Sequence, residues 1–225
     1  MKNTLYFINL DSEEDNFNKY SIYLDLLSLE KQILVHNFKF DIDKKLSILS
    51  DLFVRYVACM DLSLDNCELS FSKSIDGKPY LVGYPNFHYN ITHTRNAIAI
   101  GFSDKPIGVD IERIKEAKLE VAERFFCKSE LDYIISNDKD KDRLFHEIWI
   151  KKESYVKWNG KGLSLQLNSF DVTDASISRY LSLFEMNDYI ISVCCKDGFH
   201  KPDLLLLNGK QAHQVLEKFI SLCVL

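Results

Sequence analysis

The sequence predicts an α+β protein with antiparallel strand pairs and two long helices. Residues 43–60 and 143–158 carry apolar side chains at helical spacing, which predicts the two helices. Residues 69–81 and 97–111 alternate apolar and polar side chains around turn sequences, which predicts the strand pairs. The chain of 225 residues is long enough to bury a sizeable core, as one large domain or two small ones.

The composition excludes several classes of protein. With 46% hydrophobic and 27% charged residues, the chain has the composition of a folded soluble protein. Its net charge of −5 argues against a general nucleic-acid binder. The six cysteines form no C-x-x-C pair, and no segment resembles a signal peptide or a membrane span. We therefore expect a cytoplasmic protein with reduced thiols and no nucleic-acid or membrane partner, and we expect it to be a monomer.

Two helices are predicted in the first half of the chain. Helical periodicity covers residues 21–31 and 43–60, and Asp43 is the expected N-cap of the second helix. Lys31 and Lys45 lie on these helices. Taken alone, both lysines are most simply interpreted as solvated helix charges.

Strands are predicted for residues 5–10, for a hairpin over 69–81 and for residues 87–94. The stretch 97–111 is expected to form one further antiparallel pair. His93, near the end of the third segment, is either a half-buried structural histidine or a contact to a phosphate or base edge. The local sequence alone favours the structural interpretation.

A boundary near residue 104 is expected to divide the chain into an N-terminal half, 1–104, and a C-terminal half, 105–225. The second half begins with the strand that ends at 111. Short helices are then predicted over 119–126 and 129–137, the latter capped by its first residue with Asp132 in the capping-box position.

The helix over 143–158 is expected to end at Gly160. Strands over 188–195 and 203–207 and a helix over 210–220 complete the chain, and we expect this tail to be structural. The four consecutive leucines of the last strand predict that it is buried.

Two carboxylates share one face of the strand over 107–114. Ile107, Val109 and Ile111 alternate with Gly108, Asp110 and Glu112 along this strand, so the apolar side chains face a core and the acids project together from the other side. Such a pair can hold a hard cation. An ordinary solvent-exposed face is the simpler interpretation of a single D-x-E.

Glu153 provides a possible third acid. It starts from the flank of the long helix that borders the core, between Lys152 and Lys157. The side chain is either a member of a structural ion pair or a third ligand of a Mg²⁺ ion facing Asp110 and Glu112. Three carboxylates and one Mg²⁺ sum to −1, so a bound pyrophosphate would require nearby cations, for which the candidates are Lys152, Lys157, Lys78 and His93.

Four motifs occur in order along the chain: Gly77-Lys78-Pro79, Asn90-Ile91-Thr92-His93-Thr94, Ile107-Gly108-Val109-Asp110-Ile111-Glu112, and Trp149-Ile150-Lys151-Lys152-Glu153-Ser154-Tyr155-Val156-Lys157 followed by Gly160-Lys161-Gly162-Leu163. Together they resemble the 4′-phosphopantetheinyl transferases, with their pattern (V/I)G(V/I)D-x-E … W-x-x-KE-(A/S)-x-x-K … G-x-GL. Motif order and length are similar to the large, surfactin-synthetase-activating type. The family often has Ser-His-Ser where this chain has Thr92-His93-Thr94, so the hydroxyl is kept.

The resemblance implies a fold and a reaction. The fold is two similar halves related by a pseudo-twofold axis, each an antiparallel sheet packed on a long helix. The reaction transfers the 4′-phosphopantetheine group of coenzyme A to a serine of an apo acyl- or peptidyl-carrier protein, with Mg²⁺, and releases adenosine 3′,5′-bisphosphate. The attacking serine belongs to the carrier, which agrees with the lack of a Ser-His-Asp signature in this chain.

The resemblance also implies roles for individual residues. Asp110, Glu112 and Glu153 are the implied metal ligands, Glu153 is also the implied base, directly or through a water, and Lys157 stabilises the transferring phosphate. The remaining implied contacts are to coenzyme A: Gly77 and Lys78 to the nucleotide, Thr92 and His93 to the 3′-phosphate end, Lys152 to a phosphate or in a salt bridge, and Lys31 and Lys45 to further phosphates.

Two other classes of function remain open from the residues alone. A non-catalytic module that binds coenzyme A or a nucleotide would use Lys78 and His93 but has no need of the three acids. A Mg²⁺-dependent phosphohydrolase would use the acids without a carrier protein.

Overall fold

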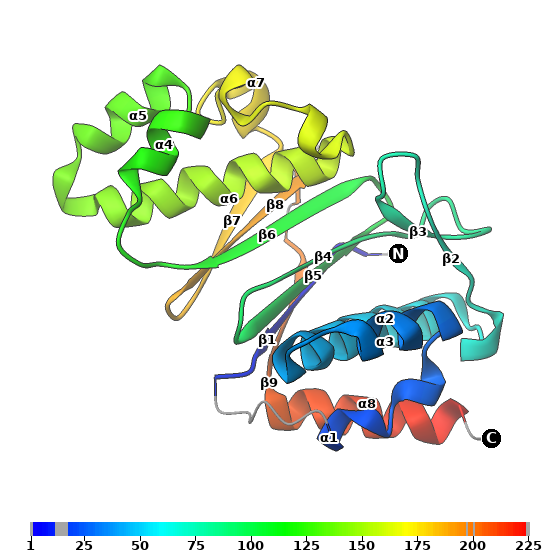
Figure 1. Ribbon diagram of the computed structural model, residues 1–225. Helices are drawn as coiled ribbons and strands as arrows, with labels where there is room; N and C mark the ends of the chain where they lie inside the picture. The colour runs from blue at the N-terminus through cyan, green and yellow to red at the C-terminus, as the bar shows by residue number, and fades with distance from the viewer. Residues whose placement is uncertain (1, 12–17, 197, 200, 224–225) are drawn as a thin grey trace.

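The computed structural model describes residues 2–11, 18–196, 198–199 and 201–223 and shows an α+β protein of four layers (Figure 1). Helices, a first sheet, a second sheet and further helices follow one another across the molecule. The predicted α+β class is confirmed. Among the helices within these ranges, none combines the length and the apolar character needed to cross a membrane.

The first sheet has the spatial order β4 (His88–His93), β5 (Ala97–Ser103), β1 (Thr4–Asn9) and β9 (Asp203–Asn208). Neighbouring strands are antiparallel except for β1 and β9, which are parallel. The second sheet is antiparallel, with the order β6 (Ile107–Arg113), β8 (Tyr189–Cys195) and β7 (Leu181–Met186). The predicted hairpin forms separately from β2 (Phe71–Lys73) and β3 (Pro79–Leu81).

Helices cover the outer face of the first sheet. These are α1 (Asn18–Ser21), α2 (Leu29–Asn37), α3 (Asp41–Leu62) and α8 (Gly209–Cys223). Leu46, Leu49 and Phe53 of α3 are almost completely buried, as their helical spacing predicts. A second apolar layer lies between the two sheets, where Leu5 and Ala99 meet residues of β6 and β8.

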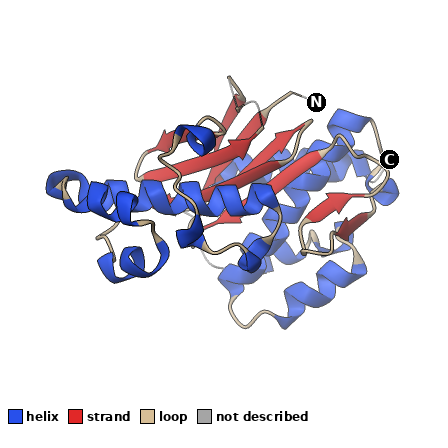
Figure 2. Cartoon of the chain, turned by 90° about the horizontal axis from the view of Figure 1, so that it is seen from above, coloured by secondary structure: helices blue, strands red, loops and turns tan. Residues whose placement is uncertain are grey.

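The second sheet packs against α6 (Lys141–Asn159), which lies over the strands when the molecule is seen from above (Figure 2). The predicted helix end is correct, because Gly160 adopts a φ of +80°. A small helical lobe lies along α6 and contains α4 (Leu119–Phe125), α5 (Lys128–Ile135) and α7 (Ala175–Ser178). Short 3₁₀ turns, including η4 (Gly162–Ser164) and η5 (Leu167–Ser169), follow α6.

Two predicted helix starts in the first half are wrong. The helix expected over 21–31 is interrupted, because Ser28 accepts a hydrogen bond from the Lys31 N–H and starts α2 there. The helix expected from Asp43 begins two residues earlier, so Asp43 lies in its first turn, where an acid favours the helix dipole, and does not cap it.

The expected cap of α5 is also wrong. Ser129 and Asp132 were the predicted pair, but Cys127 is the N-cap residue. Glu130 completes the capping box by accepting the Cys127 N–H at 2.8 Å. The helix therefore starts earlier than expected, and Glu130 points into the protein.

The predicted antiparallel pairing within 97–111 does not occur. After β5, the chain crosses to the second sheet, where β6 pairs with β8. Strands β5 and β6 approach each other closely at Gly101, since a Cβ there would lie only 2.7 Å from Val109 Cγ2. The two sheets thus meet through side chains instead of a shared backbone ladder.

The end of the chain returns to the first half. β9 extends the first sheet beside β1, and α8 packs on α3, so residues 203–223 of the expected 105–225 half lie with the first sheet. The parallel β9 also means that the first sheet is not purely antiparallel. The expectation that the leucines of this strand are buried is wrong, because β9 lies at the sheet edge and Leu206 is 55% exposed.

Polar side chains join the two sheets. Asn90 Oδ1 accepts the Val109 N–H at 2.7 Å, which links β4 to β6. The ammonium of Lys78 donates to Ile107 O and Lys157 O, each at 2.8 Å, and so links the β2–β3 hairpin to β6 and α6. Burial lowers the pKa of Lys78 from 10.5 to about 8.

This pKa predicts a pH dependence of stability. Between pH 8 and 10.5 the unfolded chain holds a proton on Lys78 that the folded chain has lost, so this residue's contribution to stability rises with pH across that window. We expect the unfolding free energy of the wild type, relative to Lys78→Met, to increase between these two pH values in denaturant titrations. Lys73→Met, which removes an exposed lysine of β2, is the control. The prediction is contradicted if the unfolding free energy of the wild type, relative to Lys78→Met, stays constant or falls between pH 8 and 10.5.

Candidate active site

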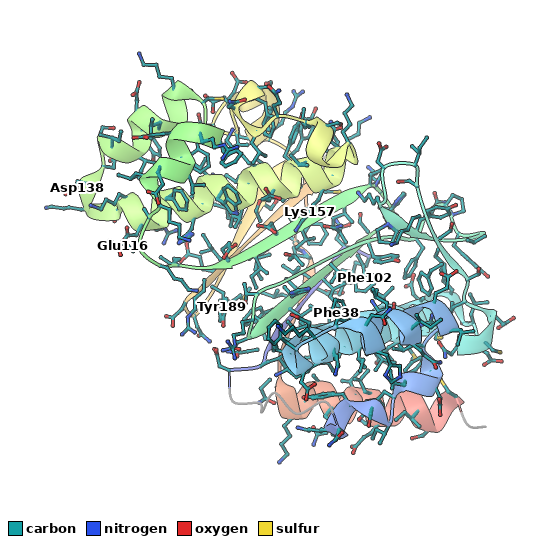
Figure 3. All side chains as sticks on the ribbon, viewed as in Figure 1. Phe38, Phe102, Glu116, Asp138, Lys157 and Tyr189 are labelled. Atoms are coloured by element: carbon teal, nitrogen blue, oxygen red, sulfur yellow. The ribbon has the colours of Figure 1, made fainter. Side chains whose placement is uncertain are left out.

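Three elements meet at Asp110. The carboxylate is 7% exposed, and its Oδ1 atom accepts hydrogen bonds from Thr92 Oγ1 at 3.0 Å and from Lys157 Nζ at 2.6 Å. Lys157 also donates to Val109 O at 3.1 Å, in the space between α6 and β6 (Figure 3). Strand β4, strand β6 and helix α6 each therefore contribute one polar side chain to a single contact.

The local sequence explains this geometry. Ile107, Val109 and Ile111 are buried toward the first sheet, so the residues that alternate with them face α6, as the strand pattern predicts. Gly108 lies so close to the helix that a Cβ there would be 2.1 Å from Ser154 O. Since only glycine fits, α6 approaches β6 closely enough for Lys157 to reach Asp110.

Glu112 and Glu153 belong to the same electrostatic neighbourhood. Burial, and then the charge of Asp110, raise the pKa of Glu112. The same two causes, in the same order, raise the pKa of Glu153, while Lys157 acts in the opposite direction. A bound cation would stabilise the charged forms of Glu112 and Glu153, which burial and the charge of Asp110 disfavour.

Asp110, Glu112 and Glu153 match Mg²⁺ in the type of ligand atom that they offer. Carboxylate oxygens are the ligands that Mg²⁺ prefers, together with water and phosphate oxygens. In the part of the chain that the structure describes, no three Asp, Glu, His or Cys side chains form a set that encloses a metal ion. Asp110 instead faces the ammonium of Lys157. The acids are thus gathered near one another, and coordination would require their side chains to reorient.

A hollow of about 270 Å³ lies on the side of the first half and is lined by Lys31, Asp43, Ser47 and His93, among others. Partial burial, followed by the charge of Lys157, lowers the pKa of His93. Burial also lowers the pKa of Lys31, while Asp51 at 3.9 Å acts against this effect. The structure therefore brings two of the predicted coenzyme contacts, Lys31 and His93, to the same hollow.

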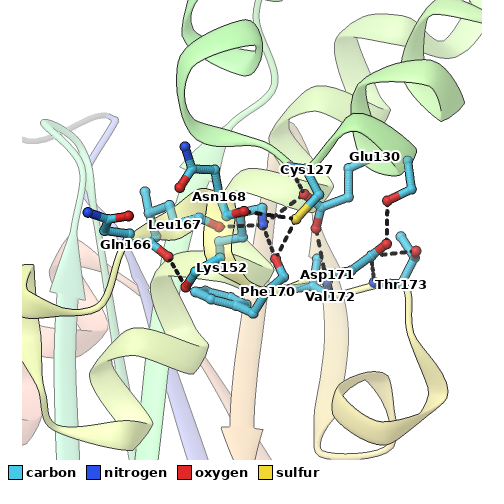
Figure 4. Close-up of polar contacts among 12 residues, drawn as sticks. Cys127, Glu130, Lys152, Gln166, Leu167, Asn168, Phe170, Asp171, Val172 and Thr173 are labelled. Atoms are coloured by element: carbon cyan, nitrogen blue, oxygen red, sulfur yellow. Dashed lines mark hydrogen bonds and ion pairs between the residues drawn. The ribbon is translucent and has the colours of Figure 1, made fainter.

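Two predicted coenzyme contacts are not supported. Lys152 is completely buried, and its ammonium contacts Glu130 at 2.7 Å (Figure 4). Lys45 is completely buried as well. In this structure neither ammonium is exposed to solvent. The salt-bridge alternative for Lys152 is the one that the geometry supports.

Gly77, Lys78 and Thr92, which were also predicted to contact coenzyme A, have the following surroundings in the structure. Gly77 forms a turn with a φ of +84°, and the neighbouring Lys78 ammonium is bonded to two backbone carbonyls. The hydroxyl of Thr92 is directed at Asp110. Sequence reasoning missed Asn90, although its place two residues before Thr92 puts both side chains on one face of β4.

Two further hollows flank the acids. One of about 310 Å³ borders Glu112 and is lined by Lys115, Lys118, His146 and others. One of about 460 Å³ borders Glu153 and includes Phe125 and Val156. A larger hollow of about 500 Å³ lies beside β1, β7 and β9 and contains none of the three acids.

Comparison with known proteins identifies the family. Residues 106–202 match the family model described as the 4′-phosphopantetheinyl transferase superfamily, and residues 14–103 match the model described as 4′-phosphopantetheinyl transferase, N-terminal. The chain is 32% identical over 224 residues to the 4′-phosphopantetheinyl transferase Sfp of Bacillus subtilis (strain 168), which covers 92% of this chain and 98% of that protein. It is 39% identical over 150 residues to the 4′-phosphopantetheinyl transferase ffp of Bacillus subtilis, covering 66% of this chain and 67% of that protein.

A vertebrate relative is also similar. The L-aminoadipate-semialdehyde dehydrogenase-phosphopantetheinyl transferase of Xenopus laevis is 30% identical over 165 residues, which cover 66% of this chain and 54% of that protein. The two family models together cover β4 and β5 of the first sheet, the whole second sheet and the site around Asp110. The chain therefore belongs to the 4′-phosphopantetheinyl transferase superfamily and is a transferase enzyme of the Sfp type.

Proposed function

We propose that this transferase moves the 4′-phosphopantetheine group from coenzyme A to a serine of an apo acyl- or peptidyl-carrier protein. The observation that carries the proposal is the contact of Thr92, Asp110 and Lys157, with Glu112 and Glu153 beside it. A divalent cation and a cationic side chain are the groups that phosphoryl transfer requires. The alternative functions are a phosphohydrolase and a non-catalytic binding module. Incubation with coenzyme A, Mg²⁺ and an apo carrier protein distinguishes them.

The chemistry is assigned to residues as follows. The serine oxygen forms a bond to the phosphorus that carries the pantetheine group, and the bond from that phosphorus to the bridging oxygen breaks, so that adenosine 3′,5′-bisphosphate leaves. Glu153 accepts the serine proton, directly or through a water, and burial raises its pKa in the direction that suits a base. Lys157 stabilises negative charge on the transferring phosphate. Mg²⁺ held by Asp110, Glu112 and Glu153 would neutralise the diphosphate.

The nucleotide end of coenzyme A is assigned to the first half of the chain. Lys31 and His93 share a hollow that suits the 3′-phosphate, and the Thr92 hydroxyl donates a hydrogen bond to Asp110. The turn at Gly77 is the assigned backbone contact to the nucleotide. We also propose that the enzyme is a cytoplasmic monomer.

Incubation with coenzyme A, Mg²⁺ and an apo carrier protein tests the function. We expect the carrier to gain the mass of one phosphopantetheine group. Free phosphopantetheine without carrier labelling would indicate a phosphohydrolase. Binding of coenzyme A without any product would indicate a non-catalytic module.

Removal of one acid should abolish the transfer. We expect Asp110→Ala and Glu153→Ala to lose carrier labelling, because each variant removes a side chain of the proposed phosphate site. Both variants should remain folded by circular dichroism and thermal unfolding, because neither side chain belongs to the hydrophobic core. Glu147→Ala is the matched control, since this acid of α6 pairs with Lys151 away from the site. Full labelling by either acid variant would refute the assigned roles.

Removal of Lys31 should weaken binding only of ligands that carry the 3′-phosphate. Losing one charged contact is expected to raise the KM for coenzyme A roughly tenfold in Lys31→Ala. Dephospho-coenzyme A lacks that phosphate and should show nearly the same KM with the wild type and the variant. Lys39→Ala, an exposed lysine outside the hollow, is the control. Equal losses for both ligands would place the 3′-phosphate elsewhere.

A further inference from the structure

A buried guanidinium on α3 is fixed by three neighbours. Arg55 is 4% exposed, and its Nε atom donates to Asp51 Oδ2 at 2.8 Å. Its Nη1 atom donates to Asn66 Oδ1 at 3.0 Å. The guanidinium also lies over the ring of Phe71, 5.1 Å from the ring centroid. Because two hydrogen bonds and one face are occupied, Arg55 has a single defined orientation.

One carboxylate joins this guanidinium to Lys31. The second oxygen of Asp51, Oδ1, lies 3.9 Å from Lys31 Nζ, and about a quarter of each side chain is exposed. A partly exposed pair of this kind contributes little when both side chains are free to move. Here Arg55 already holds the carboxylate, so the pairing with Lys31 orders only one further side chain.

A second path runs from Arg55 to the backbone that leads into α2. Asn66, which accepts from Arg55, donates through Nδ2 to Leu26 O at 2.9 Å. Leu26 is the last residue of the 3₁₀ turn η1 (Leu24–Leu26), directly before the capped start of α2. Lys31 projects from the first turns of that helix. Arg55 therefore ties down both the partner of the Lys31 ammonium and the chain that carries it.

Asp51 also favours the charged form of Lys31. Burial lowers the pKa of Lys31, the charge of Asp51 raises it again, and the charges of Lys73 and Arg55 lower it further. The titratable and charged groups around the ammonium and its hollow come from three elements: Asp43, Asp51 and Arg55 of α3, Lys73 of β2 and His93 of β4. Without the carboxylate of Asp51, Lys31 would lose its proton at a lower pH.

We propose that Asp51 and Arg55 are positioning residues, which hold the charged Lys31 side chain at the hollow assigned to the 3′-phosphate of coenzyme A. This inference rests on the proposed function through that assignment. Neither Asp51 nor Arg55 is among the residues that line the hollow, so both act through Lys31 and touch no substrate. Since the contact of 3.9 Å is longer than a hydrogen bond, the donors of Lys31 remain available to a phosphate while Asp51 stays nearby.

Calorimetric titration of two ligands over a pH series tests the inference. Coenzyme A and dephospho-coenzyme A differ only in the 3′-phosphate, so groups that act on both alike, such as Lys78, cancel in the ratio of the two affinities. We expect the wild-type ratio to fall as the pH rises above neutral and Lys31 loses its proton. In Asp51→Asn the fall should occur at lower pH, because the variant removes the charge but keeps an oxygen that can accept from Arg55.

A second substitution at Lys31 separates positioning from a general structural role. Lys31→Arg keeps its charge throughout this pH range, so the affinity ratio should stay flat. Asp51→Asn added to Lys31→Arg should then cause no displacement with pH. A purely structural role of Asp51 would instead lower the unfolding free energy of both backgrounds and leave the pH profile of the Lys31 background in place, which would overturn the inference.

Controls exclude other causes of a changed profile. Asp61→Asn removes another acid of α3, which lines a different hollow beside β9, and should keep the wild-type profile. Asp51→Ser, smaller and uncharged, carries the test if Asp51→Asn does not unfold cooperatively.

Two results would count against the inference in distinguishable ways. Identical pH profiles of the wild type and the Asp51 variants would overturn it while leaving the proposed transfer intact. Equal affinity of the wild type for both ligands at neutral pH would overturn the assignment of the 3′-phosphate to Lys31, and the inference with it. Failure of the proposed function itself is seen separately, as absence of carrier labelling.

Discussion

The close packing of β6 on α6 is the contact on which the site depends. A Cβ at Gly108 would also lie 2.3 Å from Trp158 N, so any other residue would push the helix away from the strand. At this short separation Lys157 reaches Asp110, and Glu153, one turn earlier on the same helix, enters the field of that carboxylate. A strand and a helix that are separated by the 27 residues 114–140 therefore act as one rigid support.

The second feature that shapes the site is the junction between the two sheets. Since β6 shares no backbone ladder with the first sheet, side chains such as Asn90 and Thr92 make polar contacts across the junction, and Lys78 ties the β2–β3 hairpin to β6. Residues from both halves thereby face the same acids.

Local patterns predicted the parts of the site that follow from a single element. Strand alternation placed Asp110 and Glu112 on one face, and the four-residue helical spacing placed Glu153 and Lys157 together. Position next to Glu153 suggested a ligand role for Lys152, but adjacent helical residues point about 100° apart, and its partner Glu130 lies on another helix. The strand exchange after β5 and the return of β9 to β1 are long-range pairings, which no local pattern specifies.

We propose that Asp110, Glu112 and Glu153 would hold a divalent cation beside the diphosphate and that Lys157 stabilises the transferring phosphate. Crystals of the enzyme grown with coenzyme A and Mn²⁺, a cation with usable anomalous scattering, test this claim directly. The account predicts an anomalous peak enclosed by the three carboxylates and in contact with the diphosphate. A bound coenzyme A with the peak elsewhere, or with no peak among these residues, would contradict it.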